Sequence, residues 1–428
     1  MTTTTTRRFG ALAAIAIAVA ACGSDDAAEP TDGATAETSD AAPATEAATD
    51  DTVASAGTTA TVDTAGEEPT GTDADATDGS SAPGVGASLA DVCPDPMVIQ
   101  TDWFPEAEHG ALYELVGDDY EVDVDARVVR GSMVAGGEET GIGIEVRTGG
   151  PAIGGQTVAA EAYSDDDITL AYANTEAQVL QFDATPLVSV VAPLEINPQI
   201  IYWDPATYPD VETLADLGDE EVTINIFGGG VFSDVFVANG TWSEDQVDPS
   251  YDGSPARFIS EDGAIAQQGF ASAEPYSYEE EFEEWGQPVA FQTLHDAGFE
   301  VYSQTLAARP DDIAELSDCL SAFVPMVQQA AIDFIEAPDR ANAIIIDAVE
   351  SYDDFWQYSD GLARYSVETQ RELGLVGNGP DDTLGDMEED RIQTVIEQIR
   401  DDAGLDVSPD LVATDLFTNE FIDPSIGM

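Results

Sequence analysis

The stretch Asp102 to Tyr113, DWFPEAEHGALY, gathers side chains that can hold a small molecule at the end of a short apolar run. Trp103 and Phe104 offer flat faces that stack on a planar or apolar ligand. His109, one of 2 histidines in the chain, can donate a hydrogen bond, coordinate a metal or cap a helix. Tyr113 is a further candidate contact. The alternatives are core packing for the aromatic pair and a structural role for His109.

Turns that follow predicted strands supply backbone N–H groups, which bind ligand oxygens at helix N-termini. Such turns occur in RTGGPAIGG, AYANTEA and FGGGVFSD. Their candidate contacts are Thr148, Gly149, Gly150, Asn174, Thr175, Gly228, Gly229 and Gly230. A glycine turn alone is more often only a turn, and Asn or Thr can simply cap a helix. Their recurrence at corresponding places in two half-chains indicates a cleft.

Two charged residues could contact a ligand in that cleft. Glu274, followed closely by Tyr276, could accept a hydrogen bond from a ligand amine, or could be one more acidic residue at a helix start. Arg147 is either a contact for a ligand anion or an ion-pair partner within its lobe, and we favour the ion pair.

Several enzyme classes are excluded by what the chain lacks. It contains no lysine, so a lysine Schiff base with pyridoxal phosphate is impossible. It has no G-x-S-x-G, Walker or dinucleotide-binding motif, and His109 and His295 have no zinc-site spacing. We therefore expect no enzyme, no cofactor and no metal. A carboxylate-pair hydrolase and a surface lipoprotein without a transport role stay open as alternatives.

The chain carries 86 Asp and Glu against 12 basic residues, all of them arginine, for a formal charge of −74. This charge argues against a nucleic-acid partner, because phosphate binding needs basic patches. Salt screens the mutual repulsion of such a surface, with a Debye length of about 8 Å at 0.15 M. The composition therefore indicates a saline habitat.

The N-terminus predicts export. Arg7 and Arg8 precede an apolar run that is too short for a lasting membrane anchor, so residues 1–21 read as a signal peptide. The run ends in VAAC, which resembles the bacterial lipobox and implies a lipid on Cys22 and a place on the extracytoplasmic face of the cell membrane. Plain secretory cleavage is the alternative. Residues 22–90 lack the apolar content for a core and predict an acidic, disordered tether.

Export also bears on the other two cysteines. With Cys22 lipidated, Cys93 and Cys319 remain as an even pair in an oxidising compartment. We expect a disulfide between them, and two separate buried thiols are the alternative.

From Leu89 onward the chain has globular composition over a length that exceeds one comfortable core, so two lobes are expected. Strands and helices alternate, which predicts an α/β fold with largely parallel sheets. Strands are predicted at 97–103, 142–146, 168–172, 187–191, 222–227 and 299–306. Helices are predicted at 108–116, 156–163, 211–217, 232–238, 313–337, 341–356, 367–373 and 387–403.

DWFPEAEHGALY, TGGPAIGGQTVAA and QQGFASAEPYSYE resemble segments of the solute-binding proteins of ABC importers, in the thiamine-pyrimidine and nitrate, sulfonate and taurine group. The resemblance implies a type II periplasmic-binding fold, with two α/β lobes, two chain crossings and closure on a ligand. It places lobe one at 91–195, lobe two at 196–298, and a return to lobe one with a helical tail at 299–428. The implied partners are a small organic solute and an ABC permease, with the protein a monomer. An insert at 118–140 lengthens the connection before the second strand.

These residues predict a cleft in which Trp103 and His109 form the lobe-one wall, opposite Gly228 to Gly230 and Glu274. A heteroaromatic or amine-bearing solute is favoured over an anion, because the field of the protein is strongly negative. The backbone donors leave an anion possible.

Overall fold

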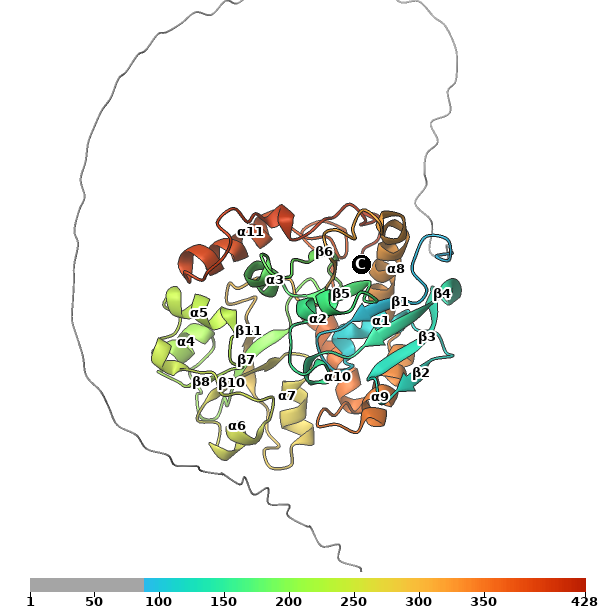
Figure 1. The fold of residues 1–428 in the computed structure, drawn as a ribbon. Coiled ribbons are helices and arrows are strands. Elements are labelled where there is room, and N and C mark those ends of the chain that lie inside the picture. Colours follow the sequence, from blue (N-terminus) through green and yellow to red (C-terminus); the bar gives the residue numbers. More distant parts are fainter. Residues whose placement is uncertain (1–87) are drawn as a thin grey trace, which may run out of the picture. The chain divides into compact units, whose positions relative to one another are not determined.

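The computed structural model describes residues 88–428. The predicted signal peptide, the lipidation at Cys22 and nearly all of the predicted tether lie outside these residues. The part described contains two β-sheets, each covered by helices. In Figure 1, α2, α3 and β5 lie near the middle of this part, and α4, α6, α8, α9 and α11 lie toward its outside.

The first sheet has seven strands, and its central strands are buried on both faces, as expected where helices cover a sheet on two sides. β1 pairs in parallel with β4 and β5, whereas β12 runs antiparallel to β5 and β6. In spatial order the strands are β2 (Glu121–Asp123), β3 (Val128–Ala135), β4 (Glu138–Arg147), β1 (Met97–Gln100), β5 (Leu170–Ala173), β12 (Thr305–Ala308) and β6 (Val188–Val191).

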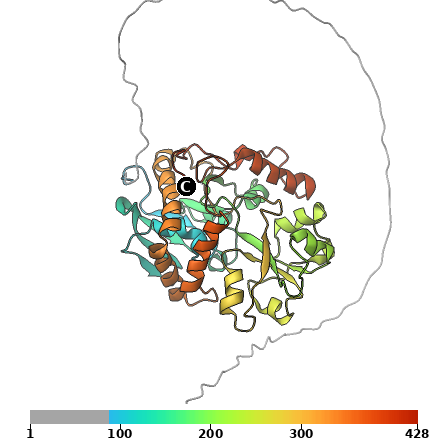
Figure 2. The same cartoon turned by 180° about the vertical axis from the view of Figure 1, so that it is seen from behind.

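Helices cover both faces of this sheet. The larger core lies between the sheet and α1, α8, α9 and α10, which pack on the face that Figure 2 turns toward the viewer. A smaller core joins the opposite face to α2. The bounds are η1 (Ala107–His109), α1 (Gly110–Glu114), η2 (Gly150–Ile153), α2 (Val158–Ser164), α3 (Thr175–Gln181), α8 (Ser317–Glu336), α9 (Asp339–Tyr352) and α10 (Asp360–Glu372).

The second sheet has five strands, in the order β11 (Ala290–Thr293), β7 (Gln199–Trp203), β10 (Ala266–Phe270), β8 (Ile224–Asn225) and β9 (Val247–Asp248). One face packs on α4 and α5, and the other packs on α6 and the turns after β10. The bounds are α4 (Leu214–Asp219), α5 (Val231–Ala238), η3 (Glu244–Gln246), α6 (Ala256–Ser260), α7 (Glu274–Tyr276) and η4 (Ser277–Glu281). Thr213 and Asp216 form a capping box that fixes the start of α4.

The chain passes between the sheets twice, once between β6 and β7 and once between β11 and β12. Two α/β lobes joined by two crossings are what the predicted fold class requires, and that prediction is confirmed. The exact lobe limits stay a prediction.

The end of the chain packs on the second lobe. α11 (Glu389–Glu397) and η5 (Gln398–Asp402) belong to the same core as α4 and α5, and η6 (Ala413–Asp415) follows them. In Figure 1, α11 lies near both α3 and α5. The helical tail predicted after the return to lobe one is therefore divided between the two lobes.

Three sequence predictions need correction. The sheets are mixed rather than largely parallel, since most pairings in the first sheet are antiparallel. The insert at 118–140 is more than a longer connection, because it builds β2, β3 and the start of β4 onto the sheet edge. Of the strand predicted at 299–306, only the end is extended in a sheet, and residues 299–304 form the second crossing.

The predicted disulfide is confirmed. Cys93, just before β1, is bonded to Cys319 of α8, 226 residues away in the sequence. The bond ties the entry of the chain into the first lobe to the helix that follows the second crossing. Among residues 88–428, no helix is both long and apolar enough to cross a membrane.

Candidate functional site

A cavity of about 230 Å³ lies between the two lobes, with walls from both. The first lobe contributes residues that follow β1, Gln304 beside β12, and the connection between α9 and α10. The second lobe contributes Phe227 after β8, Tyr251, and the end of β10 with the turn after it. A neighbouring cavity of about 410 Å³ shares Tyr251, Glu274, Phe355 and Trp356 with it. Together they have the size of a small-molecule site.

Four carboxyl groups line the smaller cavity, those of Asp102, Glu106, Glu108 and Glu274. The first three come from one segment, because the chain leaves β1 at Gln100 and turns through Pro105 into η1. Glu106 is 9% exposed and Glu108 is 5% exposed. Burial of several carboxyl groups at one point is costly unless they are neutralised or hydrogen-bonded.

Gln304 connects two of these carboxyl groups. Its side-chain Nε2 donates to Asp102 Oδ1 at 3.3 Å and to Glu106 Oε1 at 3.4 Å. The residue is only 4% exposed, and its Oε1 is buried without a hydrogen-bond partner among residues 88–428. Gln304, a residue of the cavity lining, therefore has a buried acceptor without a donor among residues 88–428.

The remaining two carboxyl groups interact with the second lobe. Glu108 Oε1 accepts a hydrogen bond from Ser272 Oγ, which joins the lobes across the cleft. Glu274 Oε2 accepts from the backbone N–H of Phe270 at 2.6 Å. Gly269 makes room for this side chain, because a Cβ there would lie 2.7 Å from the Glu274 carboxyl carbon.

Burial dominates the acidity of the site. It raises the pKa of Glu106 well above its usual range, helped by the nearby charges of Glu108 and Asp102. Burial also raises the pKa of Glu108, and it raises the pKa of Glu274 to about 7. Glu176 of α3, within electrostatic range of Asp102, has a pKa raised to about 7 by burial.

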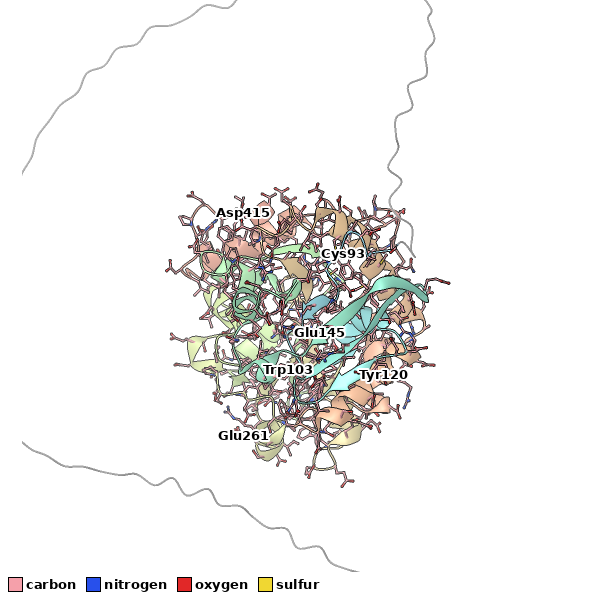
Figure 3. All side chains as sticks on the ribbon, turned by 45° about the vertical axis from the view of Figure 1, so that its right-hand side comes forward. Cys93, Trp103, Tyr120, Glu145, Glu261 and Asp415 are labelled. Atoms are coloured by element: carbon pink, nitrogen blue, oxygen red, sulfur yellow. A yellow bond between two sulfur atoms is a disulfide. The ribbon has the colours of Figure 1, made fainter. Side chains whose placement is uncertain are left out.

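Aromatic rings form the rest of the walls. Trp103 lies edge-to-face with Phe355 and Trp356, at centroid distances of 6.4 and 6.3 Å. Trp356 Nε1 donates to the backbone oxygen of Pro105 at 3.2 Å, which attaches the α9–α10 connection to the segment after β1. Across the cavity, Phe227 and Tyr251 pack at 4.6 Å. In the view of Figure 3, Trp103 lies between Glu145 of the first lobe and Glu261 of the second.

The structure brings only two of the candidates predicted from sequence, Trp103 and Glu274, to this cavity. Phe104 and Tyr113 are each 1% exposed and belong to the hydrophobic core of the first lobe. They face the core because the helices after β1 pack on the sheet there. His109 is fully buried behind the wall, with Nε2 3.0 Å from Asp102 Oδ1 and 3.7 Å from Glu106 Oε1.

The predicted turns mostly serve the fold. Thr148 and Gly149 use their backbone N–H groups on Arg127 O and Trp103 O, so these donors are not free for a ligand. Gly150, at φ +58°, packs against the Trp103 ring, where a Cβ would lie 2.6 Å from the indole. Gly149 is equally crowded by the backbone at Thr101, which explains why glycine stands there.

Other candidates lie away from the cavity. Asn174 Oδ1 accepts from Gln304 N at 2.8 Å, and Thr175 Oγ1 accepts from Tyr302 N at 3.1 Å, so both hold the second crossing in place. The residues Gly228, Gly229 and Gly230 lead into α5 and line neither interlobe cavity, and Tyr276 packs on Tyr365 instead. Arg147 forms the predicted ion pair, at 2.7 Å from both Glu145 and Asp165.

Sequence reasoning missed several wall residues. Glu106 and Glu108 lie inside the stretch that was selected for its aromatic residues. Because the whole chain is rich in glutamate, two glutamates at this spacing gave no distinct signal. Phe355 and Trp356, 250 residues beyond, carried only a helical pattern. The pair of adjacent aromatic residues near the end of that predicted helix is the signal that could have identified them, since Phe355 is 55% exposed.

Basic side chains are missing from the cavity lining within residues 88–428. The same part of the chain has no group of three or more His, Cys, Asp or Glu arranged to hold a metal ion.

No family model and no curated protein matches the sequence. The two sheets and two crossings decide the architecture. The chain folds into two α/β lobes with two crossings between the sheets. Solved structures of periplasmic binding proteins are similar to it at low identity. The periplasmic aliphatic sulphonate binding protein from Escherichia coli is 13% identical, and the match covers 72% of this chain and 86% of that one, with a TM-score of 0.46.

Two further structures give similar values. The periplasmic nitrate-binding protein from Synechocystis PCC 6803 is 11% identical over 77% of this chain and 88% of that one, with a TM-score of 0.47. The ligand-binding component of an ABC-type import system from Staphylococcus aureus, solved with zinc bound, is 12% identical over 77% and 97%, with a TM-score of 0.46. The resemblance drawn from the sequence names the same group of proteins.

Proposed function

We propose that this protein is an extracytoplasmic solute-binding lipoprotein, which captures a small organic molecule between its lobes and delivers it to an ABC importer. The observation that carries the proposal is the interlobe cavity, whose walls come from both lobes. A ligand that contacts both walls favours the closed arrangement through contacts that the open one lacks. Rotation of the lobes would take place about the two crossings between the sheets, with the tail from α11 to η6 moving together with the second lobe on which it packs.

The wall residues have distinct roles in this proposal. Trp103, Trp356 and Tyr251 contact the body of the solute, whereas the carboxyl groups and Gln304 bind its polar atoms. No catalytic step is assigned, and we expect no resident cofactor or metal. The protein acts as a monomer whose partners are the solute and the permease.

Solute capture is tested by native mass spectrometry on protein purified from its host, which should reveal a small molecule bound one to one. Small-angle scattering before and after removal of that molecule by partial unfolding and refolding should show a more extended apo form. A protein that carries nothing, and whose dimensions do not respond to any added solute, would refute solute capture.

Membrane attachment is a separate part of the proposal. Lipid on Cys22 would hold the mature chain at the outer face of the membrane, so Cys22→Ser should move the protein into the soluble fraction. Fractionation of host membranes with an antibody against the protein measures this. Retention of the serine variant at the membrane would contradict the lipid anchor but would leave solute capture untouched.

A further inference from the structure

The interlobe cavity is acidic in a way that the composition of the chain does not explain. Most acidic side chains of residues 88–428 are at least partly exposed, but Glu106 and Glu108 are more than nine-tenths buried. Two partly buried glutamates elsewhere have an arginine partner. Glu195 lies 2.8 Å from Arg391, and Glu114 lies 3.0 Å from Arg340. The cavity lining contains four carboxyl groups and, within residues 88–428, no arginine.

We propose that the solute is an organic cation whose protonated nitrogen carries N–H donors, and that this nitrogen binds between the cavity carboxyl groups and Gln304 Oε1. This assignment rests on the proposed function of solute capture and names the chemical class of what is captured. The cation would supply the counter-charge that the protein itself does not place at the site.

Gln304 gives evidence that is independent of the carboxyl groups. Its Nε2 is committed to Asp102 and Glu106, so its Oε1 must point away from them, and that oxygen is buried without a partner. An oxygen acceptor can be satisfied only by a donor. A primary or secondary ammonium or a guanidinium provides one, whereas a sulfonate, nitrate or carboxylate presents only acceptors.

The aromatic walls suit the same ligand class. Trp103 and Trp356 on one side and Tyr251 on the other belong to the cavity lining. Ring faces attract a cation at close range, most strongly for tryptophan. A planar or aliphatic body attached to the nitrogen would pack between these rings.

The acidity of the buried groups supports this arrangement. Burial raises the pKa of Glu106, Glu108 and Glu274, which means that burial disfavours their ionised forms. His109 contacts Asp102 and Glu106 from behind and can balance at most one of the charges. A cation in the cavity would favour the ionised carboxylates through direct attraction.

The test uses matched probes that differ only in the head group. Benzylamine, benzyl alcohol and phenylmethanesulfonate share one benzyl group and carry a positive, neutral or negative head. Benzyltrimethylammonium keeps the positive charge but has no N–H donor. The matched series on a butyl body consists of butylamine, butanol and butanesulfonate. Binding to the Cys22→Ser full-length chain is measured by calorimetry and by thermal shift at pH 7.5, at constant ionic strength.

We expect at least one amine to bind about tenfold or more tightly than its alcohol, and more tightly than the quaternary ammonium, while the sulfonates do not bind. Glu106→Gln and Glu274→Gln should each weaken amine binding by about tenfold to a hundredfold. Glu279→Gln, an exposed neighbour outside the cavity, is the matched control and should leave it unchanged. Thermal unfolding of each variant verifies that it is folded.

Two outcomes overturn the cation assignment. The first is that an alcohol or a sulfonate binds more tightly than its matched amine, and that Trp103→Ala weakens this binding. In that case the protein would still capture a solute, but one of another chemical class. The other is absence of amine binding in both series at millimolar concentration. If, in addition, the host-purified protein carries no small molecule, the proposed function fails as well.

Discussion

Trp103 is the residue at which the sequence and the structure agree most closely. It lines the interlobe cavity, is only partly buried, and is held by Gly150 on one side and Trp356 on the other. Trp103→Ala should weaken solute binding by about 1 to 3 kcal/mol while the fold stays nearly as stable, as for an aromatic hot spot. Calorimetry with the co-purified solute measures the binding free energy, and thermal unfolding measures the stability of the fold.

Tyr163→Ala serves as a control for Trp103→Ala, because Tyr163 is 41% exposed on α2 and outside the cavity. Unfolding of the Trp103 variant, or unchanged affinity in it, would show that this indole only packs.

The buried carboxyl group of Glu274 predicts how the stability of the protein depends on pH when no solute is added. Burial raises its pKa to about 7, above the value of about 4.3 in an unfolded chain, so the folded state holds its proton more firmly. Its contribution to stability is full below about pH 4 and is lost as pH rises through 7. Glu274→Gln, which cannot ionise, should therefore be more stable than the natural protein at pH 8, by about 1 to 3 kcal/mol.

Urea unfolding between pH 5 and 8 measures this difference, which should shrink toward pH 5. Exposed Glu279→Gln should show no such trend. A constant difference at every pH would mean that ionisation of Glu274 is not responsible.

At the scale of elements, α11 is placed to control the two crossings between the lobes. Arg391 donates to Glu195 Oε1 at 2.8 Å and to Glu195 O at 2.9 Å on the first crossing. On the second, it donates to Glu300 O at 2.6 Å and Val301 O at 3.1 Å, and its guanidinium stacks 3.7 Å from the Tyr302 ring. One buried side chain thus fastens both segments about which the lobes would turn.

Arg391→Met keeps most of the volume but leaves Glu195 and three carbonyl groups without their donor, so it should destabilise the protein by about 3 to 5 kcal/mol. Adding Glu195→Gln should recover part of the loss. Arg400→Met is the control, since Arg400 pairs only with its exposed neighbour Asp401 and one distant carbonyl. Urea unfolding compares the four proteins. An Arg391 variant as stable as the Arg400 variant would show that this contact set contributes little.

The disulfide is a second device at this scale. Because it joins residues 226 apart, it restricts the unfolded chain strongly, and the pair Cys93→Ser with Cys319→Ser should cost about 2 to 4 kcal/mol. Chemical unfolding measures the loss. In the Cys22→Ser chain, unfolded without a reductant, a thiol reagent should find no free cysteine, and two free thiols would contradict the bond.

For the molecule as a whole, the formal charge of −74 predicts that stability depends on salt. Repulsion between carboxylates acts over about 30 Å at 0.01 M salt and about 3 Å at 1 M, so the melting temperature should rise over this range. NaCl and KCl should act alike, because screening depends on ionic strength rather than on the ion. A flat melting temperature would count against adaptation to a saline medium.

The sequence by itself determined the features that depend on local pattern and composition. The alternation of strands and helices placed the long helices and half of the strands, and two cysteines left after export predicted the Cys93–Cys319 bond. The strand end at Asp102 to Trp103 identified one wall of the site. These signals are local, because a strand followed by a polar turn and a helix start is written in consecutive residues.

Tertiary structure alone decided which residues meet across the cleft. Whether Phe104 or Trp103 faces the cavity depends on where α1 packs, and Tyr113 is drawn into the core by the same contact. Gln304, Tyr251 and Trp356 reach the site from places far apart in the chain. Burial, which is a property of the packed chain and not of its local sequence, distinguishes Glu106, Glu108 and Glu274 from acidic residues that are solvated.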